Sequence, residues 1–362
     1  MFDVARCLYA NGKLERIVTG YPKIRLKNEN LPATKIEAHS FFQISASALV
    51  KGQLGNGKLL QKIHEKNAQH LDRATAKIIG DSNLIAMSSL GVKTGRLVKQ
   101  RGNIFIINRS SHHIVSQRKI LEEQSAIWGW PETLPTQESI DRELEEYQLA
   151  DKIVVPSNSS FKSFENQSVE MSKIFVNPFP LPSWQIGYNK VPKKNLLYVG
   201  NVTLQKGFPT LIKAFNLLKL SDVLLHVVGV YSKPFIEFLK KQGLFFDNVI
   251  MHGPLHSKRL VTMYEVSDVF ILPSVHDGWG IVVNEAMSHG CIPIVSKSAG
   301  ASDQIIHGVN GFVFEAGDVT ALSENILKGL GNEELRNRMS SLLSSSDFFK
   351  RTWDNFCGVY TH

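Results

Sequence analysis

Residues 195–230 read NLLYVGNVTLQKGFPTLIKAFNLLKLSDVLLHVVGV, in which two short apolar runs flank a segment with helical periodicity. Both runs are apolar almost throughout rather than alternating, which is typical of parallel strands that are buried on both faces. Parallel neighbours need a crossover between them, and the middle segment is long enough to supply a helix. The stretch therefore predicts a strand, a helix and a second strand of a doubly wound sheet.

The rest of the second half of the chain repeats this alternation. Further helices are expected at residues 234–243 and 258–267. Further strands are expected at residues 248–253, 268–274, 292–296 and 311–314. Short apolar runs that alternate with helical stretches indicate an α/β domain whose helices cover both faces of a parallel sheet. We place this C-terminal domain at residues 181–346.

The first half shows the pattern less regularly and predicts a second α/β domain at residues 1–180. Its expected helices are 51–80 and 112–128, and its expected strands are 14–20, 34–39, 83–89, 103–111, 152–157 and 173–179. The chain opens on a helix-like stretch, so the first strand of this domain is expected to be missing. The proline-rich residues 177–195 break both periodicities and are the expected linker. Residues 347–362 are expected to form a closing amphipathic helix that crosses back to the first domain.

Length and composition fit a globular protein of two domains. The chain has 362 residues, of which 43% are hydrophobic and 20% charged, and its formal charge of +8 favours a phosphate-bearing ligand or an anionic surface. No apolar run approaches the roughly 20 residues that span a bilayer, and the opening lacks the basic leader of a secretory signal. Cys7, Cys291 and Cys357 are far apart, which suits a reducing compartment. A cytoplasmic protein is the simplest interpretation.

Residues 276–296, HDGWGIVVNEAMSHGCIPIVS, carry the strongest signal for chemistry. Asp277 follows the expected strand 268–274, at the carboxyl edge where open α/β sheets bind ligands, and Glu285 lies in the next helix. Eight residues of helix rise about 12 Å and return to nearly the same face, which places both carboxylates along one side of a trough. Glycosidase carboxylates lie only about 5 to 9.5 Å apart. The wider spacing predicts an elongated ligand such as a nucleotide sugar.

Glycines and cations near this motif predict an anion site. Gly278 and Gly280 would leave N–H groups at the start of the helix open to phosphate oxygens. Gly200 ends the strand at 195–200, and Lys206 opens the following helix. The Lys206 ammonium group and the free N–H groups of both loops would therefore converge on one diphosphate, the charged part of a nucleotide sugar.

A histidine pair is a third candidate. His112 and His113 follow the expected strand 103–111 in the first domain, on the opposite side of the expected cleft. A histidine at that position could meet the reacting part of a ligand.

Residues 273–296 resemble the signature block of the family-4 glycosyltransferases, in which seven residues separate an acidic residue from a Glu. Asp277 and Glu285 have this spacing. The stretch VGNVTLQKG at 199–207 looks like the glycine and lysine loop of the family, and GASDQIIHGVNGFVF at 300–314 resembles the segment that follows the signature. The resemblance covers most of the C-terminal domain.

The resemblance implies two facing Rossmann-like domains with a cleft between them, the GT-B arrangement, and sugar transfer with retention at the anomeric carbon. In the first domain it is looser, although residues 108–124 and 143–157 look like one branch of the family. The family usually has Arg where this chain has Asn201, so Lys206 is expected to carry more of the charge that faces the diphosphate.

Carried over residue by residue, the resemblance implies a ribose contact at Glu285 and a contact to donor-sugar hydroxyls at Asp277. Lys206 would neutralise the diphosphate, and His113, with His112 as the less favoured alternative, would lie near the transferred sugar. The expected donor-binding residues are Gly200, Asn201, Lys206, Gly278, Trp279, Gly280, Ile281 and Glu285.

Other interpretations of the same residues stay open. Asp277 could be a helix N-cap and Lys206 an ordinary solvated lysine. A different GT-B enzyme, such as a phosphorylase or a sugar-nucleotide epimerase, would share the motifs, as would a non-catalytic sugar-nucleotide-binding or scaffolding protein. The basic helix at 92–102 could rest on anionic lipid at the inner face of a membrane, although a solvated face is the favoured interpretation.

Cofactors and partners follow from the same residues. The sequence has neither the spacing of a His, Cys and Asp/Glu metal site nor a DxD pair, so we expect no metal and no cofactor besides the donor substrate. Basic and aromatic residues are not interleaved as in nucleic-acid binders, which argues against nucleic acid. The expected partners are a nucleotide sugar and a glycan, lipid-linked or small-molecule acceptor in polysaccharide, glycolipid or other glycoconjugate synthesis.

Overall fold

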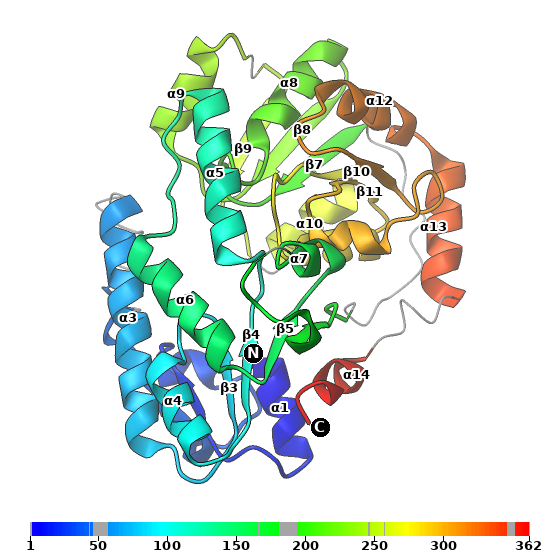
Figure 1. Cartoon of the computed structure of the whole chain (residues 1–362). Coiled ribbons are helices and arrows are strands. Elements are labelled where there is room, and N and C mark those ends of the chain that lie inside the picture. The colour runs from blue at the N-terminus through cyan, green and yellow to red at the C-terminus, as the bar shows by residue number, and fades with distance from the viewer. Residues whose placement is uncertain are drawn as a thin grey trace.

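The computed structural model describes residues 2–42, 44–45, 57–165, 167–180, 194–244, 247–256, 258–345 and 352–361. Two α/β domains lie one above the other in Figure 1, with the C-terminal domain at the top. All the described strand pairs are parallel. The predicted α/β class with parallel sheets is confirmed.

The C-terminal domain is built on a six-stranded sheet in the order β12-β11-β10-β7-β8-β9. The strands are β7 (Asn195–Val199), β8 (Leu224–Val228), β9 (Val249–Gly253), β10 (Val269–Leu272), β11 (Ile292–Ser296) and β12 (Phe312–Phe314). The chain runs outward from β7 to β9 and then returns to the other side of β7 with β10. The carboxyl ends of β7 and β10 therefore flank the topological switch point, where open sheets form a crevice.

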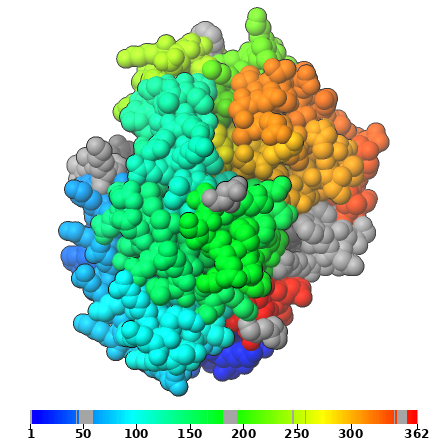
Figure 2. Space-filling model, viewed as in Figure 1, coloured from blue at the N-terminus to red at the C-terminus, as the bar shows by residue number. Residues whose placement is uncertain are grey.

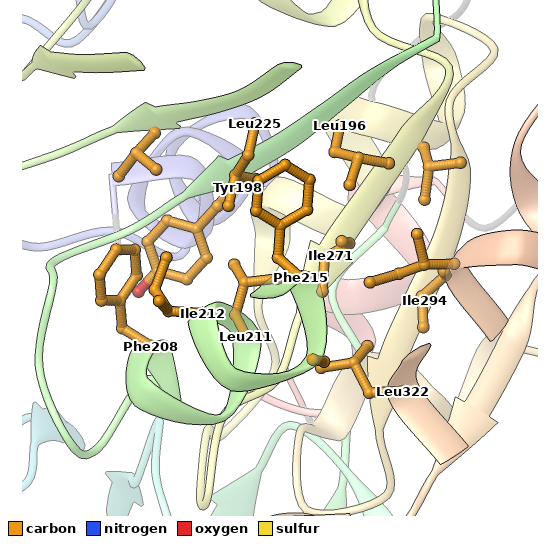
Figure 3. Packing of buried hydrophobic residues seen from close by; sticks show 14 of the residues in the cluster. Leu196, Tyr198, Phe208, Leu211, Ile212, Phe215, Leu225, Ile271, Ile294 and Leu322 are labelled. Carbon is orange, nitrogen blue, oxygen red and sulfur yellow. The ribbon is translucent and has the colours of Figure 1, made fainter. Parts of the chain in front are cut away.

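Helices cover both faces of this sheet, as the apolar strands predicted. They are α8 (Phe208–Leu218), α9 (Lys233–Lys241), α10 (Lys258–Val266), α11 (Ile281–Ser288), α12 (Val319–Gly329) and α13 (Glu333–Ser345). Leu196 and Tyr198 of β7 face a core shared with α8, α9 and α12 (Figure 3), while Leu197 and Val199 face a second core with α10 and α11. Successive side chains of one strand thus enter two cores, which is why the run is apolar throughout.

The N-terminal domain has a four-stranded sheet in the order β3-β4-β5-β6 and a separate pair, β1-β2. The strands are β1 (Ile17–Thr19), β2 (Ile36–Ala38), β3 (Leu84–Met87), β4 (Phe105–Asn108), β5 (Lys152–Val155) and β6 (Ile174–Val176). The helices are α1 (Phe2–Ala10), α3 (Gly57–Ile78), α4 (Val92–Gln100), α5 (Ile114–Trp128), α6 (Gln137–Leu149) and α7 (Asn158–Lys162). Short 3-10 turns lie at Lys23–Leu26, Ala33–Lys35, Met171–Lys173 and, in the C-terminal domain, Gly300–Gln304, which is η4.

The last helix, α14 (Trp353–Gly358), packs against α1 and covers one face of the N-terminal sheet. The amide of Asn177 donates to the carbonyl of Phe356 over 3.0 Å, and the amide of Asn108 donates to the hydroxyl of Tyr360 over 2.6 Å. The end of the chain is therefore part of the N-terminal core. Several parts of the expected elements lie outside the described residues. They are residues 51–56 of the expected helix 51–80, 181–193 of the expected linker, and 347–351 and 362 of the expected closing helix.

Helix α4 is the basic segment that sequence analysis weighed as a membrane contact. Its Arg96 pairs with Glu145 and its Lys99 with Asp151, both at 2.5 Å. The following Arg101 donates to two backbone carbonyls at the end of α3. Because these three cations form ion pairs and hydrogen bonds within the N-terminal domain, the structure favours the interpretation of α4 as a solvated helix face. None of the helices in the described ranges is long and apolar enough to cross a membrane.

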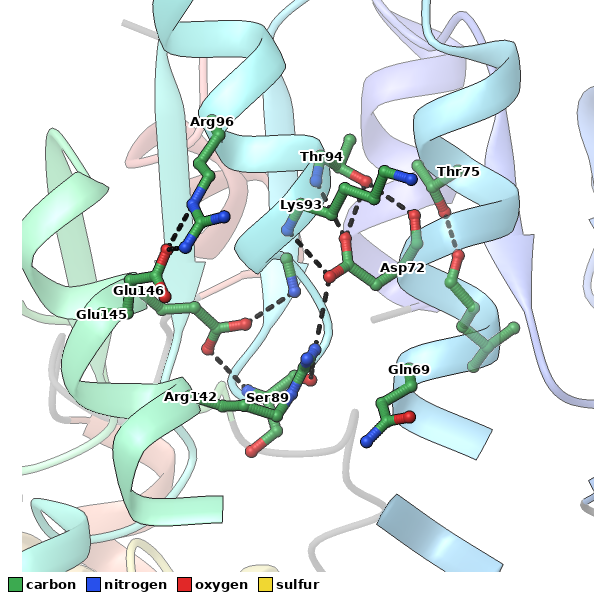
Figure 4. Close-up of polar contacts among 12 residues, drawn as sticks. Gln69, Asp72, Thr75, Ser89, Lys93, Thr94, Arg96, Arg142, Glu145 and Glu146 are labelled. Carbon is green, nitrogen blue, oxygen red and sulfur yellow. Dashed lines mark hydrogen bonds and ion pairs between the residues drawn. The ribbon is translucent and has the colours of Figure 1, made fainter. Parts of the chain in front are cut away.

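Two buried carboxylates fix the start of α4 (Figure 4). Asp72 of α3 accepts from the N–H groups of Lys93 and Thr94, at 2.8 and 2.9 Å. Glu146 of α6 accepts from the N–H groups of Ser89 and Gly91, both at 2.6 Å. These bonds satisfy donors that a helix start leaves unpaired. They hold the loop after β3 in one conformation.

We expect Phe356→Ala to lower the free energy of unfolding by about 3 to 5 kcal/mol, because it removes a fully buried aromatic side chain. Phe356 is 2% exposed and stacks on Phe179 with a ring separation of 5.3 Å. Phe41→Ala is the matched control, since Phe41 is 73% exposed. Urea denaturation measures both. Equal stability of the two variants would contradict the placement of α14 in the core.

Candidate active site

The ion pair between Lys206 and Asp277 lies at the switch point of the C-terminal sheet. Lys206 is in the loop between β7 and α8, and Asp277 is in the loop between β10 and α11. The Lys206 Nζ atom is 2.5 Å from the Asp277 Oδ2 atom, and both side chains are partly exposed. The sequence placed both residues at the carboxyl edge of the sheet, and the structure brings them into direct contact.

The backbones of these two loops also touch. The N–H group of Val275 donates to the carbonyl of Gln205 over 2.9 Å. Gly207 adopts a φ of 65°, and a Cβ atom there would lie 1.8 Å from the carbonyl oxygen of Pro273. Only glycine permits this approach. The glycine next to Lys206 is therefore required to bring the two loops together.

Glu285 is the second acidic residue of the motif and lies in α11. Its Oε2 atom accepts from the hydroxyl of Tyr264 on α10 over 2.7 Å. Burial and the neighbouring Glu285 carboxylate raise the pKa of Tyr264 well above its ordinary value. Tyr264 therefore stays a donor at neutral pH, and it holds the Glu285 carboxylate at the side of α11.

The predicted helical spacing between Asp277 and Glu285 is wrong. Helix α11 begins only at Ile281, after Gly280, which has a φ of 90°. About half of the eight-residue interval is loop, so the rise of 12 Å and the shared helix face do not apply. The left-handed Gly280 explains the difference, since a helix cannot continue backward through that conformation.

Gly278 and its neighbours contact the N-terminal domain. A Cβ atom on Gly278 would lie 1.9 Å from the carbonyl oxygen of Ser110, in the loop after β4. The N–H group of Asn158 at the start of α7 donates to Asp303 of η4 over 2.7 Å. The two domains are in contact along this boundary in the space-filling view (Figure 2). Gly278, expected at a phosphate, here permits close packing of the domains.

Of the two candidate histidines, His112 faces the ion pair and His113 does not. The Nδ1 atom of His113 accepts from the N–H group of Val115, so His113 is the N-cap of α5. Its ring is buried against Tyr147 and Phe164. His112 instead lies with its ring centroid 5.3 Å from that of His276, next to Asp277. The structure thus places His112, and not His113, beside Asp277, because the N-cap position turns a side chain back onto its own helix.

His276 and Arg109 are site residues that sequence analysis missed. His276 is fully buried directly before Asp277. The buried guanidinium of Arg109 donates to the carbonyl of His112 over 2.9 Å and so holds that residue in place. In the sequence, His276 could have been recognised because it lies inside the motif at 276–296. Arg109 could have been recognised because it is a cation at the carboxyl end of an expected strand.

Burial and the nearby cations keep the three histidines neutral. Burial and the Arg109 guanidinium lower the pKa of His112 to about 4, although Asp277 acts in the opposite direction. Burial, together with His112, Lys206 and Arg109, lowers the pKa of His276 to about 3. Burial and Arg109 lower the pKa of His113 to about 4. All three rings are uncharged at neutral pH.

The other expected donor-binding residues lie around the same edge. Asn201 is exposed after β7, and its carbonyl accepts from the hydroxyl of Tyr198 over 2.7 Å. Gly200 is tightly packed against Gly229, the residue that follows β8. A Cβ atom on Gly229 would lie 1.9 Å from the carbonyl oxygen of Gly200. Ile281 is exposed at the start of α11, whereas Trp279 is buried beneath the loop.

Metal ligands do not gather here. Within the described residues, no three His, Cys, Asp or Glu side chains lie close enough to hold a metal ion.

The C-terminal domain is similar to a known protein family. Residues 185–341 match the family described as glycosyl transferases group 1. The lipopolysaccharide 1,2-N-acetylglucosaminetransferase of Salmonella typhimurium is 26% identical over 232 residues, which are 56% of this chain and 59% of the relative. The capsular polysaccharide biosynthesis glycosyltransferase CapM of Staphylococcus aureus is 31% identical over 157 residues, 41% of this chain and 40% of the relative. The chain thus spans about half the length of the curated relatives that it matches.

Solved structures extend the likeness to both domains. HepE of Anabaena, in complex with UDP and glucose, superposes with a TM-score of 0.66 at 16% identity over 99% of this chain and 95% of that chain. TarM superposes with a TM-score of 0.62 at 17% identity over 81% of this chain and 57% of that chain. The predicted GT-B fold is confirmed. The solved structures thus show the fold of both domains, and the family match covers residues 185–341 of the C-terminal domain.

We expect Gly278→Ala to loosen the domain contact. The new Cβ atom would have to move from 1.9 Å to at least the 3.4 Å of an ordinary contact with the Ser110 carbonyl, and backbone cannot yield as a flexible side chain would. The Asn158 N–H group at the same boundary should then exchange its hydrogen at least about tenfold faster. Gly80→Ala is the control, because a Cβ atom there meets nothing closer than 3.7 Å. Unchanged exchange at Asn158 would contradict the interpretation.

We also expect His276 to make the free energy of unfolding decrease at acidic pH. Its pKa of about 3 in the folded chain lies below its ordinary value of 6.5. Between these values the unfolded chain binds more protons, so stability falls as pH decreases, by up to about 1.4 kcal/mol per pH unit for this group. Urea denaturation at about pH 7 and about pH 5 should show a smaller loss for His276→Asn than for the wild type. An equal loss in both would rule out a buried neutral His276.

Proposed function

We propose that this protein is a retaining glycosyltransferase of family 4, which transfers a sugar from a nucleotide-diphosphate sugar to an acceptor hydroxyl. The observation that carries the proposal is the Lys206–Asp277 pair at the switch point, with α11 and Glu285 beside it. One ammonium group and two carboxylates at a sheet edge match the parts of a nucleotide sugar, which has a charged centre and hydroxyls at both ends.

The proposed roles follow from the chemistry of each group. The Lys206 ammonium would neutralise the diphosphate, with help from N–H groups at the start of α11. Asp277 would accept hydrogen bonds from hydroxyls of the donor sugar, and Glu285 from those of the ribose. Two similar solved structures support such ligands: HepE is in complex with UDP and glucose, and a TarM variant is in complex with UDP and α-GlcNAc-glycerol among its ligands.

We propose front-face attack as the reaction. The acceptor oxygen forms a bond to the anomeric carbon, the bond from that carbon to the diphosphate oxygen breaks, and the hydroxyl proton passes to the leaving phosphate. Lys206 stabilises the negative charge that develops on the diphosphate. Contact between the domains excludes water and so limits hydrolysis of the donor. His112, beside Asp277, would lie near the transferred sugar.

The acceptor and the setting are also proposals. Two relatives are named for lipopolysaccharide and capsular polysaccharide synthesis, which supports a glycan or lipid-linked acceptor. We propose catalysis without a metal, in the cytoplasm or at the inner face of a membrane.

A panel of UDP-, GDP- and ADP-sugars tests the donor site. A true donor at about a hundred times its dissociation constant should stabilise the protein by roughly 2.7 kcal/mol. We expect Glu285→Ala to weaken that donor about tenfold and Lys206→Ala to slow turnover by about 10²- to 10³-fold. Lys328→Ala, an exposed lysine of α12, is the control.

The outcomes separate the alternatives. Wild-type turnover by Lys206→Ala would contradict the assigned role. Donor binding without transfer to any acceptor would favour the non-catalytic protein, and a need for inorganic phosphate or turnover without an acceptor would favour the phosphorylase or the epimerase. NMR of the product would reveal inversion, and loss of activity in a chelator would refute catalysis without a metal.

A further inference from the structure

Helix α5 belongs to the N-terminal domain but reaches the C-terminal domain with its far end. It begins after His113, beside the ion pair, and ends at Trp128, about 22 Å away at the helical rise. Figure 1 shows α5 running alongside the C-terminal domain. One helix of the N-terminal domain therefore spans from the candidate site to the outer helices of the C-terminal domain.

Aromatic side chains secure this far end. The Lys213 Nζ atom of α8 lies 4.2 Å from the ring centroid of Trp128. The Trp130 ring lies 5.1 Å from Phe235 and 5.0 Å from Phe238, both on α9. Packing of this kind holds the segment after α5 against the C-terminal domain.

Glu132 follows in this segment and reaches the loop that carries Lys206. Its Oε2 atom accepts from the N–H group of Leu204 over 3.0 Å. Its Oε1 atom accepts from the N–H group of Thr133 over 3.1 Å, and its own N–H group donates to the Ser125 hydroxyl over 3.2 Å. Both carboxylate oxygens and the backbone are therefore engaged, which aims the carboxylate at Leu204.

Leu204 lies at the start of the turn that presents Lys206. Its side chain is 1% exposed, and its carbonyl accepts from the N–H group of Gly207 over 2.9 Å. The N–H group of Lys206 donates to the Thr203 hydroxyl over 3.3 Å within the same turn. The Glu132 carboxylate therefore binds the turn formed by residues 203–207. Hydrogen bonds hold this turn at both ends, and Lys206 lies within it.

We infer that Glu132 is a positioning residue for Lys206. By holding the loop that carries Lys206, Glu132 makes diphosphate binding depend on the contact between the two domains. The inference rests on the proposed function, since it assigns the diphosphate to Lys206. A hydrogen bond to a charged acceptor is among the stronger kinds. Because coupling between two sites is reciprocal, a bound nucleoside diphosphate also strengthens the contact between α5 and the C-terminal domain.

Calorimetric titration of the full-length protein with UDP, GDP and ADP tests this role. Glu132→Ala should weaken the best of these ligands about tenfold, the size expected for a hydrogen bond to a charged group. Glu132→Gln keeps an acceptor oxygen and should lose less than about threefold. The matched control is Glu123→Ala, which removes an exposed carboxylate from the preceding helix α5, and this variant should bind the nucleotides as the wild type does.

The Lys206→Ala background separates positioning from a merely structural role. If Glu132 acts through Lys206, adding Glu132→Ala to Lys206→Ala should cause no further loss of affinity. Equal affinity of Glu132→Ala and the wild type, or the same tenfold loss in both backgrounds, would overturn the inference while leaving the proposed function standing. A wild-type protein that binds none of the three nucleotides would overturn both.

Discussion

The contact between Lys206 and Asp277 is the constraint around which the other features of the site are arranged. The residues are 71 positions apart and meet because the chain reverses direction across the sheet, which makes β7 and β10 neighbours. Their loops are locked by Gly207 against Pro273 and by the backbone bond of Val275. A partly exposed ion pair contributes little stability by itself. The sheet order and the glycine therefore create the pair, and the proposed diphosphate site is built around it.

The N-terminal domain holds the same two loops from two sides. Ser110 packs on Gly278 in the loop after β10, and Glu132 binds Leu204 in the loop after β7. Both contacts come from segments that flank α5, at its two ends. Any rotation of the domains must therefore disturb one loop or both. In the proposed reaction, a movement of the domains would reach Lys206 and Asp277 through the packing of Ser110 on Gly278 and the bond from the Leu204 N–H group to the Glu132 carboxylate.

How much the sequence could predict depends on the range of each interaction. Buried parallel strands have a local signature, and the carboxyl-edge rule then locates Lys206, Asp277 and Glu285. The start of α11 was misplaced because a left-handed Gly280 is indistinguishable in sequence from a helical one. The position of the His113 side chain was missed for a similar reason, because the sequence does not show which of two adjacent histidines is the N-cap of α5. The Glu132 contact joins residues 72 positions apart, and neither loop carries a trace of its partner.

Burial also decides which group can take up the acceptor's proton in the proposed reaction. A general base works best with a pKa near the operating pH, and His112, with a pKa of about 4, is far too weak a base for that task. Burial and the nearby Arg109 cation keep the pKa of His112 low. A phosphate with a second pKa of about 6 is a stronger base than this imidazole. Burial and the Arg109 cation thus suppress protonation of His112, which favours the leaving phosphate as the proton acceptor in the proposed reaction and leaves His112 as a neutral hydrogen-bonding partner.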